Sequence, residues 1–151
     1  MRWRTARLRA AGPWLMLIGE ECGEALAERL VLAGAEVFVA RPGEGFREQD
    51  SGELTVSPAD PAALSELLRT MLVVPRTIVH ALSLASPAAR GLERFEAEQV
   101  RGVRGAVALA RALAEYESAF AEHGEEPPAI DVTLLTSAAV SVTGADPEHP
   151  E

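Results

Sequence analysis

The sequence contains no lysine, and all fourteen of its basic residues are arginine. A nucleotide-binding P-loop, a Schiff-base enzyme and the Tyr-x-x-x-Lys pair of short-chain reductases each need a lysine. The single tyrosine, Tyr116, is followed four residues later by Phe120, where the reductase pair would have its lysine. These three kinds of lysine-dependent site are therefore excluded for this chain.

Cysteine, histidine and long apolar runs are also scarce. The one cysteine, Cys22, cannot form an internal disulfide, which fits a reducing cytoplasm. The three histidines (His80, His123 and His149) lie far apart and lack metal-ligand spacing. No apolar run reaches the ~18 residues that span a bilayer, and Trp14–Ile18 is too short for the core of a signal peptide. We therefore expect a cytoplasmic protein without a metal site.

Acidic residues outnumber basic ones and give a net charge of -9. This charge argues against nucleic acid or an anionic membrane as a partner. Four arginines before residue 10 are a local exception, which we assign to a linker or edge strand over residues 1–13. The apolar content of 48% is typical of a soluble globular domain, expected here over residues 14–143 with a linker at 144–151.

Apolar patterning predicts alternating strands and helices. The predicted strands are Trp14–Ile18, Ala35–Ala40, a short edge strand at Glu53–Ser57, Thr77–Leu82 and Ile130–Thr136. The predicted helices are Glu21–Ala33, one to about Leu72 that begins with Asp60 as its N-cap and Pro61, and Leu92–Ala121 with a possible break near Gly102 or Gly105. This alternation predicts an α/β protein with a truncated Rossmann-like fold, a parallel sheet with helices on both faces.

The turn after the first predicted strand has the layout of a nucleotide-binding turn without its chemistry. A dinucleotide fingerprint needs G-x-G-x-x-G, so that the backbone approaches the pyrophosphate and helix N–H groups point at it. Here the turn runs from Gly19 to Gly23 with Glu20 and Glu21 inside it, and Glu24 follows. These carboxylates would occupy the positive end of the helix dipole and repel a diphosphate. We interpret the turn as part of a fold kept for its shape after the ligand site was lost.

Two residues near this turn have weaker functional interpretations. Arg41 follows the second predicted strand, where NADP enzymes place a residue for the 2′-phosphate, so a site of Gly19, Gly23 and Arg41 is the alternative to a surface arginine. Cys22 lies near a helix N-terminus, which favours a reactive thiol, but three neighbouring glutamates oppose this. We favour the surface arginine and a packing cysteine.

His80 and Ser83 lie at the carboxyl end of the third predicted long strand, where a base and a nucleophile would be useful. No G-x-S-x-G elbow surrounds Ser83, so hydrolase chemistry has little support. We favour a buried, hydrogen-bonded His80 that shapes the strand end. The many glutamates are assigned to solvated helix faces, and no catalytic residue is predicted.

A set of segments in a fixed order carries a family resemblance. They are Trp14–Gly19, Leu30–Val39, Arg41–Gly43, Ile78–Leu84, Phe95–Gly102 and Leu134–Gly144. Together they resemble the structural subdomain of a polyketide synthase ketoreductase, from about Trp14 to the C-terminus. One departure is Ala81, which stands where the family's His-x-Trp-Ser-Leu has tryptophan.

The resemblance implies a noncatalytic, truncated half that packs against a second half of the ketoreductase. In that family the second half binds NADPH and carries the Ser, Tyr and Lys that reduce a β-ketoacyl chain on an acyl carrier protein. The implied partners are this catalytic subdomain and neighbouring domains of a multifunctional synthase for secondary metabolites, and this chain itself would bind no cofactor. The alternatives are a free-standing NADP-binding reductase or epimerase that uses Arg41, and an acidic docking module of a synthase.

A half-domain of this kind needs an apolar surface for its partner. Val103, Val107, Ala110 and Ala114 line one face of the long predicted helix. This face is a candidate for the partner surface, and burial against the chain's own sheet is the alternative.

Overall fold

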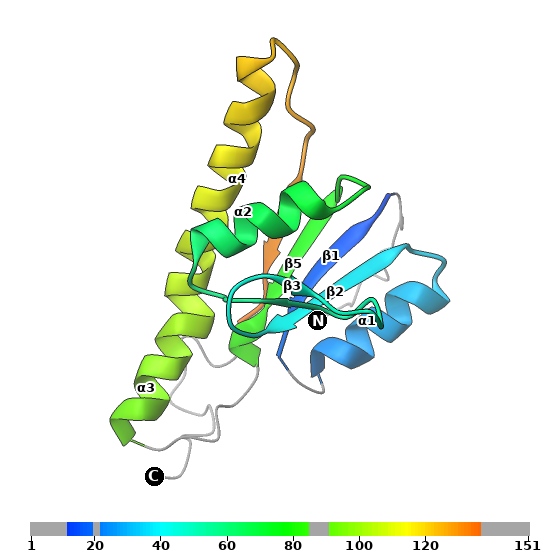
Figure 1. The fold of residues 1–151 in the computed structure, drawn as a ribbon. Helices are drawn as coiled ribbons and strands as arrows, with labels where there is room; N and C mark the ends of the chain where they lie inside the picture. Colours follow the sequence, from blue (N-terminus) through cyan, green and yellow to red (C-terminus); the bar gives the residue numbers. More distant parts are fainter. Residues whose placement is uncertain (1–11, 20–21, 85–90, 137–151) are drawn as a thin grey trace, which may run out of the picture.

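The computed structural model describes residues 12–19, 22–84 and 91–136. Within them the strands are β1 (Trp14–Ile18), β2 (Val37–Pro42), β3 (Arg47–Glu48), β4 (Leu54–Val56), β5 (Thr77–Ala81) and β6 (Asp131–Leu134). The α-helices are α1 (Cys22–Leu32), α2 (Pro61–Thr70), α3 (Gly91–Gln99) and α4 (Gly105–Glu122). A 3₁₀ turn, η1 (Leu82–Leu84), follows β5, and a π-helical turn, η2 (Val100–Arg104), joins α3 to α4 in one long rod (Figure 1).

The strands form one sheet in the order β3-β4-β2-β1-β5-β6. All neighbouring pairs are parallel except β3 and β4, which are antiparallel. The chain moves from β1 toward β2 and β4 on one side, and later returns to β5 and β6 on the other side of β1. The order therefore reverses beside β1, which is where Rossmann-like folds place a ligand crevice. The predicted truncated Rossmann-like α/β fold is confirmed.

Helices cover both faces of the sheet, as predicted, but unequally (Figure 1). On one face, α2 and α4 pack over Leu15, Leu17 and Ile78 in the larger core cluster. On the other face, α1 contributes Ala27 and Leu30 to a smaller cluster with Met16, Ile18, Val79 and Ala81. Alternate residues of β1 point to opposite faces, which is why the four consecutive residues Leu15–Ile18 are all buried.

Most predicted elements lie within three residues of their observed bounds. The Asp60 side chain caps α2 by accepting a hydrogen bond from the backbone N–H of Ala62 at 3.0 Å, as its sequence position predicts. The helical rod changes to π geometry at Val100–Arg104, next to the glycines where a break is predicted.

One prediction at the edge of the sheet is wrong. No strand is predicted between Ala40 and Glu53, and Glu53–Ser57 is predicted as the edge strand, but Arg47 and Glu48 form β3 and pair outside β4. Two residues are too few to show a period in the sequence, so patterning alone gives no sign of such a strand. The predicted domain bounds extend beyond the described residues and stay a prediction.

Candidate functional site

The turn after β1 presents an acceptor to the crevice, where a phosphate site would present a donor. Gly19 is buried directly after the strand, and its carbonyl oxygen accepts a hydrogen bond from Arg41 Nη1 at 3.4 Å. A phosphate cradle depends on backbone N–H groups that face the anion. Glu20 and Glu21 lie outside the described residues. At Gly19, the carbonyl oxygen would face a phosphate with negative partial charge and would repel it.

Gly23 is explained by packing. A β-carbon at this position would lie 2.5 Å from Cβ of Ile18 and 2.7 Å from its Cγ2, closer than such atoms approach. Only glycine therefore lets the first turn of α1 lie this close to the end of β1. Sequence reasoning, which interprets Gly23 as a remnant or an unconventional ligand residue, misses this packing role.

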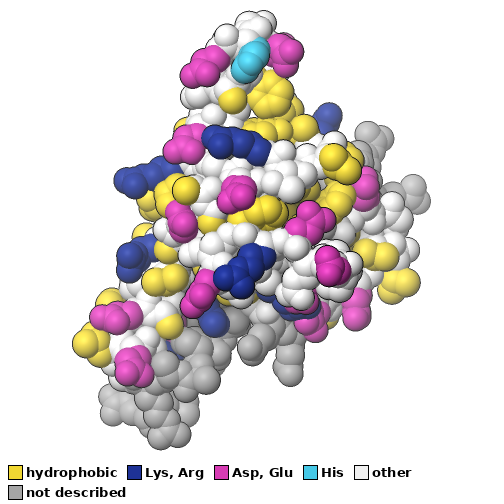
Figure 2. Space-filling view, in the orientation of Figure 1, with side chains coloured by type: hydrophobic (Ala, Val, Ile, Leu, Met, Phe, Trp, Pro, Cys, Tyr) yellow, Lys and Arg dark blue, Asp and Glu magenta, His cyan; other side chains and the backbone are white. Residues whose placement is uncertain are grey.

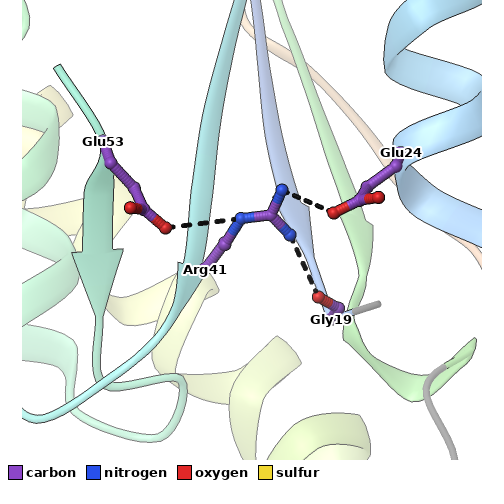
Figure 3. A network of polar contacts seen from close by, with 4 residues as sticks. All are labelled: Gly19, Glu24, Arg41 and Glu53. Atoms are coloured by element: carbon purple, nitrogen blue, oxygen red, sulfur yellow. Dashed lines mark hydrogen bonds and ion pairs between the residues drawn. The ribbon is translucent and has the colours of Figure 1, made fainter. Parts of the chain in front are cut away.

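Arg41 lies near the end of β2 and is held by the chain's own groups (Figure 3). Its Nη2 is 2.7 Å from Glu24 Oε1 on α1, and its Nε is 3.5 Å from Glu53 Oε1 just before β4. The third contact is the bond to the Gly19 carbonyl. Arg41 thus connects the turn after β1, the first turn of α1 and the residue before β4 through Gly19, Glu24 and Glu53.

The electrostatics of this cluster oppose a bound phosphate. Two carboxylates surround one guanidinium, so the group is left with an excess of one negative charge when all three side chains are ionised. A hollow of about 760 Å³ lies beside it, with Glu28 on its lining as a further carboxylate. A 2′-phosphate would have to displace Glu24 or Glu53 and approach the remaining carboxylates. Glu53, which sequence reasoning missed, is the residue that completes this arrangement.

The structure thus brings Gly19, Gly23 and Arg41 to the same end of the sheet, as the alternative NADP site requires. Each of them has a different role there, since Gly19 accepts a hydrogen bond, Gly23 allows close packing and Arg41 pairs with carboxylates. The Arg41 guanidinium, which is the cation of the alternative site, is therefore already paired within the chain.

His80 and Ser83 do not form a base and nucleophile pair. Ser83 Oγ donates to the Leu135 carbonyl at 2.8 Å, which ties η1 to the chain just after β6. His80 is 3% exposed on the α2–α4 face of β5, against the start of α4, where a β-carbon on Gly105 would lie 3.0 Å from His80 Nε2.

The burial of His80 affects both its hydrogen bonding and its charge. Its Nε2 has no hydrogen-bond partner within the described residues, so the prediction of a buried histidine is correct but this nitrogen is unsatisfied. Burial lowers the pKa of His80 below 6.5, while a backbone hydrogen bond partly opposes the shift. The ring is therefore held in its neutral form at neutral pH.

The other candidate residues belong to the core or fall outside the described part. Tyr116 packs against Phe120 edge to face, with ring centroids 5.2 Å apart, and burial raises the pKa of its hydroxyl. The side chain of Cys22 lies outside the described residues. In the described ranges, no group of three His, Cys, Asp or Glu side chains is placed to hold a metal ion, and no helix is long and apolar enough to cross a membrane.

Comparison with known proteins gives matches only at the level of structure. No protein-family model matches the sequence, and a search of curated proteins gives no match. One similar structure is a keto acid-selecting NRPS module with adenylation, ketoreductase and pseudo-Asub domains, at 16% identity and a TM-score of 0.72, covering 95% of this chain and 12% of that chain. Another is an N-terminal ketoreductase from the macrolactin assembly line, at 18% identity and a TM-score of 0.59, covering 83% of this chain and 25% of that chain.

These likenesses concern the fold. This chain spans only 12% of the first matched chain and 25% of the second. The resemblance to a ketoreductase subdomain expected from the sequence segments is therefore confirmed for the fold.

Proposed function

We propose that this chain is the noncatalytic structural half of an assembly-line ketoreductase, and that it stabilises a catalytic half. The observation that carries the proposal is a ketoreductase-like fold in which Arg41, the residue of the alternative NADP site, pairs with the chain's own Glu24 and Glu53. A half of this kind keeps the sheet and helices for shape and needs no cofactor of its own. Reduction of a β-ketoacyl chain by NADPH would then take place in the other half.

An exposed apolar stripe on the α3–α4 rod supports a protein partner. Val103 is 65% exposed and Val107 is 48% exposed, and Ala110 and Ala114 continue the same side of α4 in exposed positions. The opposite side of α4 carries the residues that enter the chain's own core, namely Ala108, Leu109, Ala112 and Tyr116. The alternative that the stripe packs against the chain's own sheet is therefore wrong.

The stripe extends onto α3, where Leu92 and Phe95 are also exposed. Figure 2 shows apolar side chains along this rod with arginine and acidic side chains between them. A run of large apolar side chains on one side of a helix, with charged groups at its margins, is typical of a protein–protein contact surface. We assign this surface to the catalytic half.

Co-expression with a catalytic ketoreductase half tests the proposal. We expect the two halves to co-purify and the catalytic half to unfold at a higher temperature in the complex. A double variant, Val103→Glu with Val107→Glu, should abolish co-purification because it places two charges in the contact. Leu72→Glu is the matched control, since Leu72 is fully exposed away from the stripe and should leave the complex intact. No co-purification of the unmodified chain would refute the proposal.

An NADPH titration of the isolated chain separates this proposal from the free-standing reductase. Trp14 begins β1, the strand that leads to Gly19, and intrinsic tryptophan fluorescence serves as the readout of the titration. We expect no saturable change. Micromolar binding, about -8 kcal/mol, that is lost in Arg41→Ala would instead support a reductase or epimerase built on Arg41.

A further inference from the structure

The connection between β2 and β4 leaves part of the sheet without a helix. Parallel neighbouring strands are usually joined by a crossover helix that covers one face. Here residues 43–53 join β2 to β4, and the regular element among them is the two-residue strand β3. On the α1 face, Val37 and Val39 of β2 therefore lie beside α1 and remain partly exposed.

An apolar groove runs between α1 and β2 at this place. Its volume is about 470 Å³, and its lining consists of Ala27, Glu28, Val31, Leu32, Val37 and Val39. Leu32 is 86% exposed at its border. The groove continues into the hollow beside Arg41, because four residues (Ala27, Glu28, Val37 and Val39) line both.

The charged groups along the groove are mostly acidic. Glu24, Glu28 and Glu53 face a single cation, Arg41, which already pairs with Glu24 and Glu53. Among the described residues, Glu28 has no ion-pair partner. An occupant of the groove should therefore combine apolar side chains with positive charge.

The first eleven residues of the chain have this composition. They contain four arginines at positions 2, 4, 7 and 9, the apolar residues Trp3 and Leu8, and no acidic residue. The chain enters the sheet beside the groove, because the Trp14 backbone N–H donates to the Glu36 carbonyl at 2.8 Å and Trp14 pairs with Val37. Eleven residues can span roughly 36 Å when extended, more than the roughly 20 Å length of a six-residue strand such as β2.

We propose that residues 1–11 dock in the groove between α1 and β2. Trp3 and Leu8 cover the apolar lining, and the arginines pair with Glu28 and the neighbouring carboxylates. The segment thereby takes the place of the crossover helix that the β2–β4 connection lacks. This proposal does not depend on the ketoreductase role.

The other end of the chain does not fit the groove. Residues 137–151 contain Asp146, Glu148 and Glu151 and no arginine, so their charge would be repelled by Glu24 and Glu28. They also follow β6, which lies on the other side of β1 from β2. Charge and topology together favour the N-terminal segment.

Tryptophan fluorescence of the full chain tests the docking. The chain has two tryptophans, so Trp14→Phe leaves Trp3 as the only reporter. We expect Trp3 emission shifted to shorter wavelength than that of free tryptophan in water, and quenching by acrylamide several times weaker. Adding Leu32→Asp should restore strong quenching, because it places a charge at the border of the groove. Leu72→Asp, at a fully exposed leucine outside the groove, should change nothing.

A second variant keeps the test valid if Leu32→Asp unfolds the chain, which circular dichroism would detect. Replacing Arg2, Arg4, Arg7 and Arg9 together by glutamine leaves the folded domain untouched and should also raise the quenching of Trp3 severalfold. The proposal is overturned if Trp3 is as accessible as free tryptophan, or if it is protected but insensitive to both changes. Protection that grows with protein concentration would assign the groove to a second copy and would equally overturn it.

Discussion

The two faces of the sheet are covered by helices to different extents. On the α2–α4 face, two helices close over the strands, and Leu64, Leu67 and Leu68 are almost completely buried. On the α1 face, one helix covers β1, while β2 keeps partly exposed valines and a groove. The difference follows from the connections, because a helix links β4 to β5 and β5 to β6 but not β2 to β4.

The two faces also differ in where a Rossmann-like fold holds a ligand. The α2–α4 face carries the larger of the two core clusters. The α1 face carries the turn where a related fold would hold a cofactor, and there Arg41 is paired with carboxylates of the same chain. On this face, polar contacts within the chain occupy the end of the sheet where the order of the strands reverses.

The largest expected loss of stability comes from truncating a buried leucine on the α2–α4 face, compared with an exposed leucine on the α1 face. Leu67→Ala removes a fully buried side chain from the α2–α4 core and should cost about 2–5 kcal/mol of unfolding free energy. Leu32→Ala, at the exposed end of α1, should stay within about 0.5 kcal/mol of the parent. Urea denaturation of both variants measures the difference. Equal costs would show that the two faces do not differ as described.

Gly23→Ala tests the tightest contact on the α1 face. The new methyl group would lie 2.5 Å from Ile18 Cβ, so α1 would have to move away from β1, at a cost of about 1–3 kcal/mol. Gly102→Ala is the control, because the nearest atom to its methyl group would be Ser83 Cβ at 4.0 Å. That change should be neutral or stabilising by up to about 1 kcal/mol. Thermal unfolding compares the two, and a Gly23→Ala chain as stable as the parent would contradict the packing role.

His80 gives the α2–α4 face a pH dependence. Burial lowers its pKa in the folded state, so the unfolded chain, with a pKa near 6.5, binds the proton more readily. The contribution of neutral His80 is fully present above about pH 6.5 and is lost as the pH falls from there toward the lowered pKa. Urea denaturation between pH 5 and 7.5 should show this slope, and His80→Gln should reduce it. An unchanged slope in the variant would assign the pH dependence to other groups.

The sequence predicts the strands and helices of the fold better than the contacts on the α1 face. Continuous apolar residues in β1, the Asp60 cap and the helical spacing of α2 and α4 determine the strands, the helices and the Rossmann-like order. These signals are local, and each agrees with the packing that it predicts. The change to π geometry at Val100–Arg104 is also local, because Gly102 and Gly105 mark this place in the sequence.

The details of the α1 face depend on residues that are distant in sequence. Glu53 lies twelve positions beyond Arg41 with no pattern that links them, and the β2–β4 connection brings it to within 3.5 Å. Gly23 lies only five positions after Ile18. The sequence does not show, however, that α1 packs so closely on β1 that only glycine fits there. The exposure of Val103 and Val107 likewise depends on which side of α4 meets the sheet, and the sequence leaves that choice open.

The smallest expected effect concerns Arg41, the charged boundary of the α1 face. Its side chain and those of Glu24 and Glu53 are a third to a half exposed, so water weakens their attraction and Arg41→Ala should cost less than about 1 kcal/mol. Arg94→Ala is the control, because Arg94 forms one exposed pair with Glu98 on α3 at 2.8 Å. The loss of stability should be smaller in concentrated salt for both variants. It should be larger for Arg41→Ala than for Arg94→Ala, because Arg41 also donates a hydrogen bond to the Gly19 carbonyl. A loss of several kcal/mol on Arg41→Ala, measured by urea denaturation, would mean that this ion network holds the α1 face together.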